Sequence, residues 1–114
     1  MATILDSGNR SEFPTGAVRD IQDGKGRFDL LPVDALFDLV RHFGSGAKKY
    51  GVDNWRKGIP LSRYMDSAAR HLFKLKRGDT DEPHAIAAVW NLMCLVETRH
   101  MIETGKLPKE LDDL

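Results

Sequence analysis

Ala85-Ile-Ala-Ala-Val-Trp-Asn-Leu-Met-Cys-Leu-Val96 is apolar on almost every side when it is drawn as a helix. A surface helix of a monomer carries one apolar and one polar face, whereas a helix that is apolar all round lies buried. Pro83 and Gly105 fit the start and the end of a helix over about residues 84–103. We therefore expect this helix in the middle of a bundle or in a subunit interface.

Two further helices are expected earlier in the sequence. Residues 62–76 predict a helix that is capped by Ser62 and ended by Gly78. Residues 31–43 predict a first helix that Gly44 ends. In the helix expected over residues 62–76, the apolar positions at helical spacing are Tyr64, Ala68, Leu72 and Leu75. In the helix expected over residues 31–43, they are Val33, Leu36, Phe37 and Val40. Three main helices predict an all-α fold, a small helical bundle.

The chain length suits one small domain over residues 1–114, because 114 residues with 41% apolar side chains supply one core. Within it we expect an irregular arm over residues 1–31, a helical core over 32–105 and a polar tail over 106–114. A fold of this size buries roughly two-thirds of the surface of its unfolded chain. A wide ligand cleft then needs a partner subunit, so we expect a homo-oligomer to complete the bundle.

Simple features exclude several classes of protein. No stretch reaches the roughly 18 apolar residues of a membrane span. The first six residues do not follow the pattern of a secretory signal, so we expect no such leader. The single cysteine, Cys94, excludes an intrachain disulfide and a zinc site built on cysteine pairs, and its place in the apolar run favours a core role. We expect a cytoplasmic protein without membrane contact.

The formal net charge is zero, yet the charges are unevenly distributed along the chain. Residues 1–40 carry four basic and seven acidic side chains, residues 41–78 carry ten and two, and residues 79–114 carry three and eight. A cationic middle beside acidic clusters is typical of a polyanion site next to carboxylates that hold a metal. Solvated helix faces are the alternative explanation.

An acidic turn precedes the third helix. Asp79, Asp81 and Glu82 supply hard oxygen ligands within four residues, and Mg²⁺ or Mn²⁺ prefers such ligands. Acidic residues at a helix start are also favoured by the helix dipole, so N-terminal capping is the alternative. His84 and Asn91 share a helix face with Asp81. They are either hydrogen-bonded core residues or ligand-holding residues that face a cleft.

Arg70 and His71 form a second candidate site in the middle of the second helix. Arg70 lies four residues after Asp66 and can simply pair with it, and His71 can be a half-buried surface residue. If this helix packs beside the third, one of the two points at the acidic turn. His71 would then be a ligand or proton carrier, and Arg70 a phosphate clamp.

Two glycine-containing stretches place cations where phosphate can approach. The cations of the arm are Arg19, Lys25 and Arg27. Residues 46–60 contribute Lys48, Lys49, Tyr50, Asn54 and Trp55. The aromatic rings of Tyr50 and Trp55 can stack on a base. Neither stretch is a Walker loop or a dinucleotide fingerprint. The zero net charge argues against a sequence-independent nucleic-acid binder, so nucleic acid is not an expected partner.

The chain resembles a phage and prophage family of dATP/dGTP diphosphohydrolase-like proteins through an ordered set of motifs: GAVRD, KGRFDLLP, GAKKYG, NWRKG, RYMDSAARHL, an acidic turn after Gly78, and H…WN. The family is similar to MazG-type all-α nucleotide pyrophosphohydrolases. The resemblance covers residues 15–97. It implies a helical, oligomeric, Mg²⁺-dependent enzyme that cleaves a deoxynucleoside triphosphate between the α and β phosphates. A phage-encoded protein would act in the host cell cytoplasm.

The resemblance carries over to single residues. The RH pair of the family falls on Arg70 and His71, its later histidine on His84, and its loop aromatics on Tyr50 and Trp55. In similar sequences the acidic turn reads as a glutamate, an aspartate three positions on, and several residues before the histidine. Here it is compressed into residues 79–84. MazG-type enzymes also carry a glutamate-rich pair on an earlier helix, where this chain offers Asp34 and Asp38.

The resulting prediction is a pyrophosphohydrolase that binds a purine nucleotide, with carboxylates holding Mg²⁺ and cations offsetting the phosphate charge. The expected catalytic residues are Asp79, Asp81, Glu82 and His71, the three carboxylates being the expected metal ligands. The expected substrate-binding residues are Arg19, Lys25, Arg27, Lys48, Lys49, Tyr50, Asn54, Trp55, Arg70, His84 and Asn91. Two alternatives remain: a module that binds a nucleotide without cleaving it, and a helical oligomer with no small-molecule site.

Overall fold

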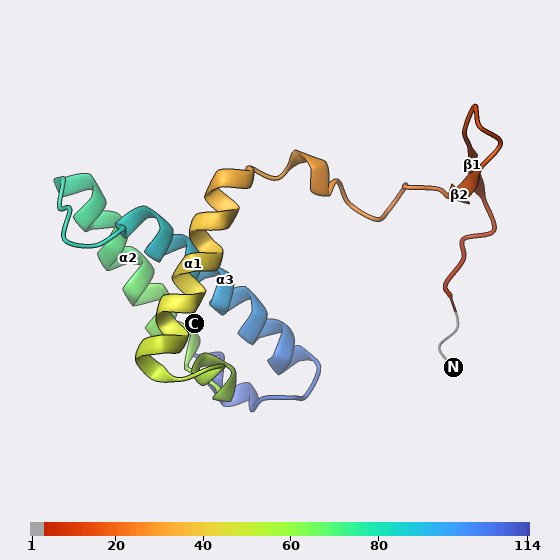
Figure 1. The fold of residues 1–114 in the computed structure, drawn as a ribbon. Helices are drawn as coiled ribbons and strands as arrows, with labels where there is room; N and C mark the ends of the chain where they lie inside the picture. The colour runs from red at the N-terminus through yellow and green to blue at the C-terminus, as the bar shows by residue number, and fades with distance from the viewer. Residues whose placement is uncertain (1–3) are drawn as a thin grey trace. The chain divides into compact units, whose positions relative to one another are not determined.

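The computed structural model describes residues 4–114, which fall into two units, residues 4–31 and Pro32–Leu114 (Figure 1). In the first unit, β1 (Arg10–Glu12) pairs antiparallel with β2 (Val18–Asp20), with Ser11 opposite Arg19. A short 3₁₀ helix, η1 (Phe28–Leu30), follows. The arm was expected to be irregular, and the hairpin corrects that expectation. Three-residue strands are too short for an alternating apolar pattern to mark them.

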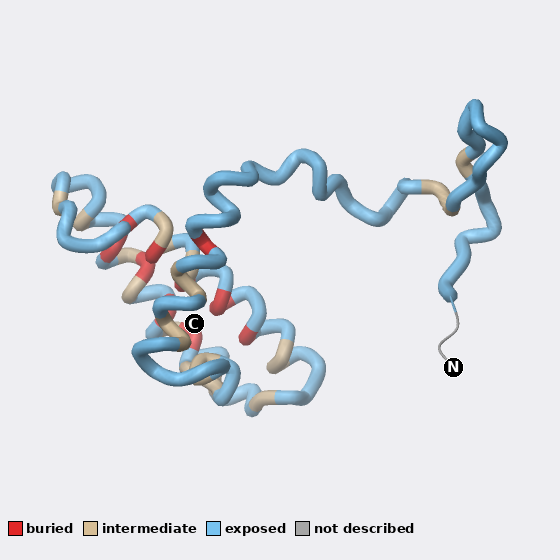
Figure 2. The backbone as a smooth tube through the Cα atoms, in the orientation of Figure 1, coloured by how far each residue is buried: buried red, intermediate tan, exposed pale blue. Residues whose placement is uncertain are grey.

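The second unit is a bundle of three helices, α1 (Val33–Tyr50), α2 (Leu61–Arg77) and α3 (His84–Glu103). Helix α3 packs against both of the others, in agreement with the first of its two predicted places, the middle of a bundle. Figure 2 shows the buried positions gathered along α2 and α3. The core consists of Leu61, Tyr64, Cys94 and Leu95, with Phe43, Trp55, Ile59, Trp90 and Ile102 packed against it. The all-α bundle predicted from the sequence is therefore the observed architecture.

Helix α1 runs seven residues beyond its predicted end at Phe43. Gly44 and Gly46 stay helical, although a glycine inside a helix costs about 1 kcal/mol relative to alanine. A Cβ at Gly46 would come to 3.9 Å from the Trp90 ring, so α1 lies close to α3 at this point. The helix ends at Gly51, whose N–H donates to the Ala47 carbonyl at 2.8 Å. Tertiary packing thus outweighs the local signal to stop.

The start of α2 and the C-terminal residues also differ from expectation. Ser62 is not the N-cap, because α2 begins at Leu61 after Pro60. Residues 106–114 were expected to form a polar tail, yet they return to the bundle through η3 (Lys109–Leu111), which packs on α3. A Cβ at Gly58 would lie 2.9 Å from Leu111 and 3.3 Å from Leu107, so these leucines cover that glycine.

The apolar stripe predicted for α1 does not face the core of its own chain. Phe37 is 57% exposed, and Val33, Leu36 and Val40 are exposed too, whereas Leu39 is the buried residue of this helix. Exposed contiguous apolar residues on a soluble chain mark contact surfaces. No helix among residues 4–114 combines the length and apolar character needed to cross a membrane.

Candidate functional site

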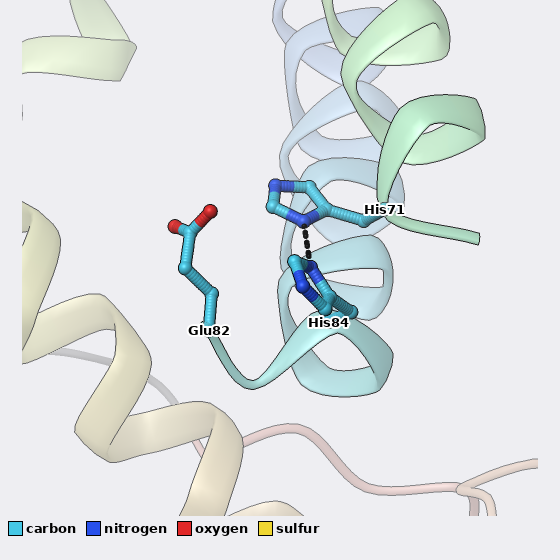
Figure 3. A group of neighbouring side chains, drawn as sticks. All are labelled: His71, Glu82 and His84. Atoms are coloured by element: carbon cyan, nitrogen blue, oxygen red, sulfur yellow. Dashed lines mark hydrogen bonds between the residues drawn. The ribbon is translucent and has the colours of Figure 1, made fainter. Parts of the chain in front are cut away.

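A pair of buried histidines joins α2 to the start of α3. His71 is 7% exposed and His84 2% exposed, and their Nδ1 atoms are 2.9 Å apart (Figure 3). His71 is brought there by the buried face of α2, which also carries Leu61, Tyr64 and Ala68. Burial lowers the pKa of His71, so its imidazole is kept neutral near pH 7. A neutral imidazole is the form that binds a metal or accepts a proton.

Asp81 holds His84 from the other side. Its Oδ1 lies 2.7 Å from Nε2 of His84, and its second carboxylate oxygen lies 3.8 Å from Nζ of Lys74. The hydrogen bond with His84 is the main reason why the pKa of Asp81 lies below its usual range. His84 is therefore buried and hydrogen-bonded to Asp81 at the start of α3.

The two remaining carboxylates of the acidic turn, those of Asp79 and Glu82, differ in their hydrogen-bond partners. Asp79 accepts two hydrogen bonds from the Arg77 guanidinium, which lowers its pKa. The carboxylate of Glu82 makes no hydrogen bond or ion pair with any residue between 4 and 114. No side chain caps the N-terminus of α3 with a hydrogen bond in the part of the chain that the structure describes.

Two overlapping groups of side chains have the composition of a metal site. His71, Glu82 and His84 form one group, and Asp79, Asp81 and His84 form the other. Within each group the candidate ligand atoms lie within 4.8 Å of one another. Imidazole nitrogen and carboxylate oxygen together suit a divalent cation. The donors present therefore fit the kind of cofactor that the sequence predicts.

These groups border the acidic hollow, a depression of about 760 Å³ between α1 and the turn before α3. Helix α1 contributes Asp38 and His42 to it, and the turn contributes Asp79, Asp81 and Glu82. Sequence analysis missed His42, whose position depends on how α1 packs on α3. Burial lowers the pKa of His42, and the neighbouring Glu82 opposes that shift.

A second depression, the aromatic hollow, measures about 740 Å³. It gathers four of the residues predicted to bind substrate, Tyr50, Asn54, Trp55 and Asn91. Phe43, Tyr64 and Trp90 add further rings to its lining. The Nε1 of Trp90 is buried and has no hydrogen-bond partner within residues 4–114, as is also true of the Tyr64 hydroxyl.

The two hollows are neighbours. His42 lines the acidic hollow, Trp90 lines the aromatic hollow, and their ring centroids are 5.7 Å apart. Trp90 was part of a recognised motif but was not predicted as a site residue. A sequence signal for it existed, because Trp90 precedes Asn91 on the helix that starts with His84.

Several predicted site residues lie elsewhere. Lys48 is exposed at the end of α1, and Lys49 places Nζ 5.0 Å from the Tyr50 ring centroid. Arg70 is exposed, and no ion pair with Asp66 forms among residues 4–114. The arm cations belong to the first unit, where Lys25 pairs with Asp20, Arg27 pairs with Asp29, and Arg19 lies on β2.

Comparison with known proteins gives one family. The family described as dATP/dGTP diphosphohydrolase, N-terminal, matches residues 15–106. No curated protein and no solved structure matches the chain significantly. The matched region includes both histidines of the buried pair, the acidic turn and the lining of the aromatic hollow except Asp113. With most of its length inside this match, the chain belongs to the dATP/dGTP diphosphohydrolase family.

Proposed function

We propose that the protein is a metal-dependent pyrophosphohydrolase that converts a purine deoxynucleoside triphosphate into a monophosphate and pyrophosphate. The observation that carries the proposal is the buried pair His71 and His84 beside the free carboxylate of Glu82. Family membership supports the same reaction, because the family is named for it. Asp79, Asp81, Glu82 and His71 are the proposed catalytic residues, and a divalent cation is proposed to bind within this cluster.

A divalent cation, Mg²⁺ or Mn²⁺, would neutralise charge on the triphosphate and favour loss of a proton from water when it is bound at this cluster. In the reaction a water oxygen bonds to the α-phosphorus, and the bond from that phosphorus to the bridging oxygen breaks. Pyrophosphate leaves with the bridging oxygen. His42, which is neutral near pH 7 and lines the same hollow, is placed to accept the proton that the water loses.

The aromatic hollow is the proposed site of the purine base. Tyr50 and Trp55 offer ring faces on which a base can stack, and Trp90 adds a further ring to the lining of the same hollow. The seven residues from His84 to Asn91 correspond to about 10 Å along a helix. An extended nucleotide can therefore place its base in one hollow and its phosphates in the other.

The cations of the chain are proposed to offset the charge of the phosphates. Lys49 lies beside Tyr50 at the rim of the aromatic hollow. Lys48, Arg70 and the arm residues Arg19, Lys25 and Arg27 remain proposed phosphate contacts. A homo-oligomer also remains proposed, because the exposed stripe of α1 offers an apolar surface to a second copy.

The test is an assay of the purified chain with dGTP and dATP in the presence of Mg²⁺ or Mn²⁺. Monophosphate and pyrophosphate are the expected products, and heavy oxygen from labelled water is expected in the monophosphate. Glu82→Gln should lower kcat/KM roughly a hundredfold or more, whereas Glu97→Gln on the exposed face of α3 should leave it unchanged. Failure of every nucleotide in a full panel to react at micromolar enzyme would overturn the proposal.

A second candidate function is nucleotide binding without cleavage. It is favoured by the ties that Asp79 makes with Arg77 and that Asp81 makes with His84, because carboxylates held in this way are less available to a cation. Recovery of intact nucleotide after tight binding that persists in EDTA would support this function. Loss of binding in EDTA would support the enzyme.

A further inference from the structure

The spacing of the buried histidine pair has a geometric meaning for metal binding. The two Nδ1 atoms are 2.9 Å apart, and a Glu82 carboxylate oxygen lies within 4.8 Å of one ring nitrogen of each histidine. Two nitrogens each about 2.1 Å from one ion are about 3.0 Å apart at right angles and about 3.4 Å apart at the tetrahedral angle. The observed spacing fits neighbouring positions on an octahedron.

The contact between Asp81 and His84 decides which nitrogen of His84 is free. A carboxylate can only accept, so Nε2 of His84 carries the hydrogen that Asp81 Oδ1 receives at 2.7 Å. The Nδ1 of His84 then has a lone pair, and it is this atom that faces His71. A carboxylate that fixes the tautomer and ring orientation of a histidine is the usual second partner of metal-binding histidines.

Glu82 completes the set from the solvent side. Its side chain rises beside the two imidazole rings in Figure 3, and it has no hydrogen bond or ion pair with the part of the chain that the structure describes. Its carboxylate is therefore available without breaking another contact. Glu82 and His84 also line the acidic hollow, which would give water or phosphate oxygens access to an ion held there.

We infer that His71, His84 and Glu82 bind a six-coordinate first-row transition-metal ion, of the Mn²⁺ or Co²⁺ kind, in preference to Mg²⁺, and that Asp81 orients His84 without binding the ion. Mg²⁺ prefers oxygen ligands and keeps several waters, whereas imidazole suits transition metals. Of the three carboxylates predicted as ligands from the sequence, Glu82 alone keeps that role. The inference rests on the proposed function only for the role of the ion in nucleotide hydrolysis, and not for its binding.

Calorimetric titration of the nucleotide-free chain tests the preference directly. Mn²⁺ or Co²⁺ should bind one ion per chain, with an affinity roughly a hundredfold above that of Mg²⁺. Bound Co²⁺ should give the weak visible absorption of a six-coordinate ion. Equal affinities for Mn²⁺ and Mg²⁺, or the intense absorption of tetrahedral Co²⁺, would overturn the inference.

Variants identify the ligands. His71→Gln and His84→Gln should abolish binding of Co²⁺, and Asp81→Asn should weaken it about 10- to 100-fold with the stoichiometry unchanged. His100→Gln is the matched control, because His100 is an exposed histidine of α3. Undiminished affinity in either of the first two variants would exclude that histidine as a ligand and overturn the inference.

A measurement on the wild-type chain keeps the inference testable if the variants do not fold. In histidine ¹⁵N spectra, Zn²⁺ as a diamagnetic probe should shift the Nδ1 signals of His71 and His84 and leave those of His100 unchanged. Unshifted Nδ1 signals with the ion bound would overturn the inference. Ion binding without nucleotide turnover would remove the proposed function alone, and turnover with Mg²⁺ in a chain that binds no Co²⁺ would remove the inference alone.

Discussion

The carboxylate of Asp113 holds the first turn of α2 through Ser62, 51 residues away in sequence. It accepts a hydrogen bond from the Ser62 backbone N–H at 2.8 Å and another from the Ser62 hydroxyl at 2.5 Å. The first N–H groups of a helix lack partners within the helix, so a remote side chain here replaces a local cap. Asp113 also lines the aromatic hollow, so the C-terminal residues are joined to the proposed base site.

This contact predicts a specific loss of stability in acid. The hydrogen bonds from Ser62 lower the pKa of Asp113 in the folded chain below 3.8, its ordinary value. The stabilisation is therefore fully present above the unfolded pKa and is lost as the pH falls through the folded pKa. Asp113→Asn should lower the thermal midpoint at neutral pH and flatten its fall between about pH 5 and about pH 2.

Asp112→Asn is the control for that measurement. Asp112 is the exposed neighbour of Asp113, and its ion pair with Arg99 spans 3.7 Å. Exposed pairs of this length contribute little to stability. A midpoint that Asp112→Asn lowers as much as Asp113→Asn would contradict the role of Asp113.

Two glycines should respond in opposite ways to replacement by alanine. Gly58 has φ +112° and would place a Cβ 2.9 Å from Leu111, so Gly58→Ala should cost at least about 1 kcal/mol. Gly44 lies inside α1 with open space around it, so Gly44→Ala should stabilise the fold by about 0.4 to 1 kcal/mol. Urea unfolding measures both values. A destabilised Gly44→Ala chain would show that α1 ends near residue 43.

The comparison of α1 with α3 shows what can be predicted from sequence. The bounds of α3 were predicted correctly because Pro83 and Gly105 act through local backbone geometry. The end of α1 was predicted wrongly because the helix continues where Phe43 and Gly46 lie close to Trp90, far along the chain. Local sequence signals therefore predict the ends of a helix correctly unless packing against a residue far away in the sequence stabilises a different end.

The same distinction applies to the site. The acidic turn and the RH pair were found because their donors are close in sequence or belong to short motifs. The position of His71 next to His84 depends on the packing of α2 on α3. The sequence could not establish that packing, so the proximity of His71 to the acidic turn was predicted only for the case that the two helices pack together. His42 was missed because neither its neighbours nor its spacing mark it, and the fold alone brings it to Trp90.

Cys94 is predicted to be unreactive in the native protein. It is fully buried, and burial raises the pKa of its thiol to about 12 from an ordinary value of 9.0. Thiol reagents attack the thiolate, whose population falls by about three orders of magnitude for such a shift. A disulfide reagent should label the native chain very slowly and the urea-unfolded chain at once. Rapid labelling under native conditions would show that α3 opens or that this end of the core is loose.

Tyr50 is predicted to hold the base by stacking. It is exposed at the end of α1 and lines the aromatic hollow, so its replacement should not disturb the core. Tyr50→Ala should raise the Kd for dGTP about 5- to 150-fold, which corresponds to about 1 to 3 kcal/mol for one stacked base. Tyr50→Phe keeps the ring and should bind almost as the wild type does. Equal binding by Tyr50→Ala, measured by calorimetry, would place the base elsewhere.

Phe37 is predicted to lie in a contact between two copies of the chain. It is exposed in the middle of the α1 stripe, next to the exposed Val33 and Val40, and water contact with such a stripe is unfavourable. A zero net charge adds no long-range repulsion between copies. Light scattering coupled to size exclusion should give an oligomer for the wild type and a smaller species for Phe37→Glu. Lys49→Glu, also exposed on α1 but on a different face from the stripe, should leave the mass unchanged, and a monomeric wild type would refute the contact.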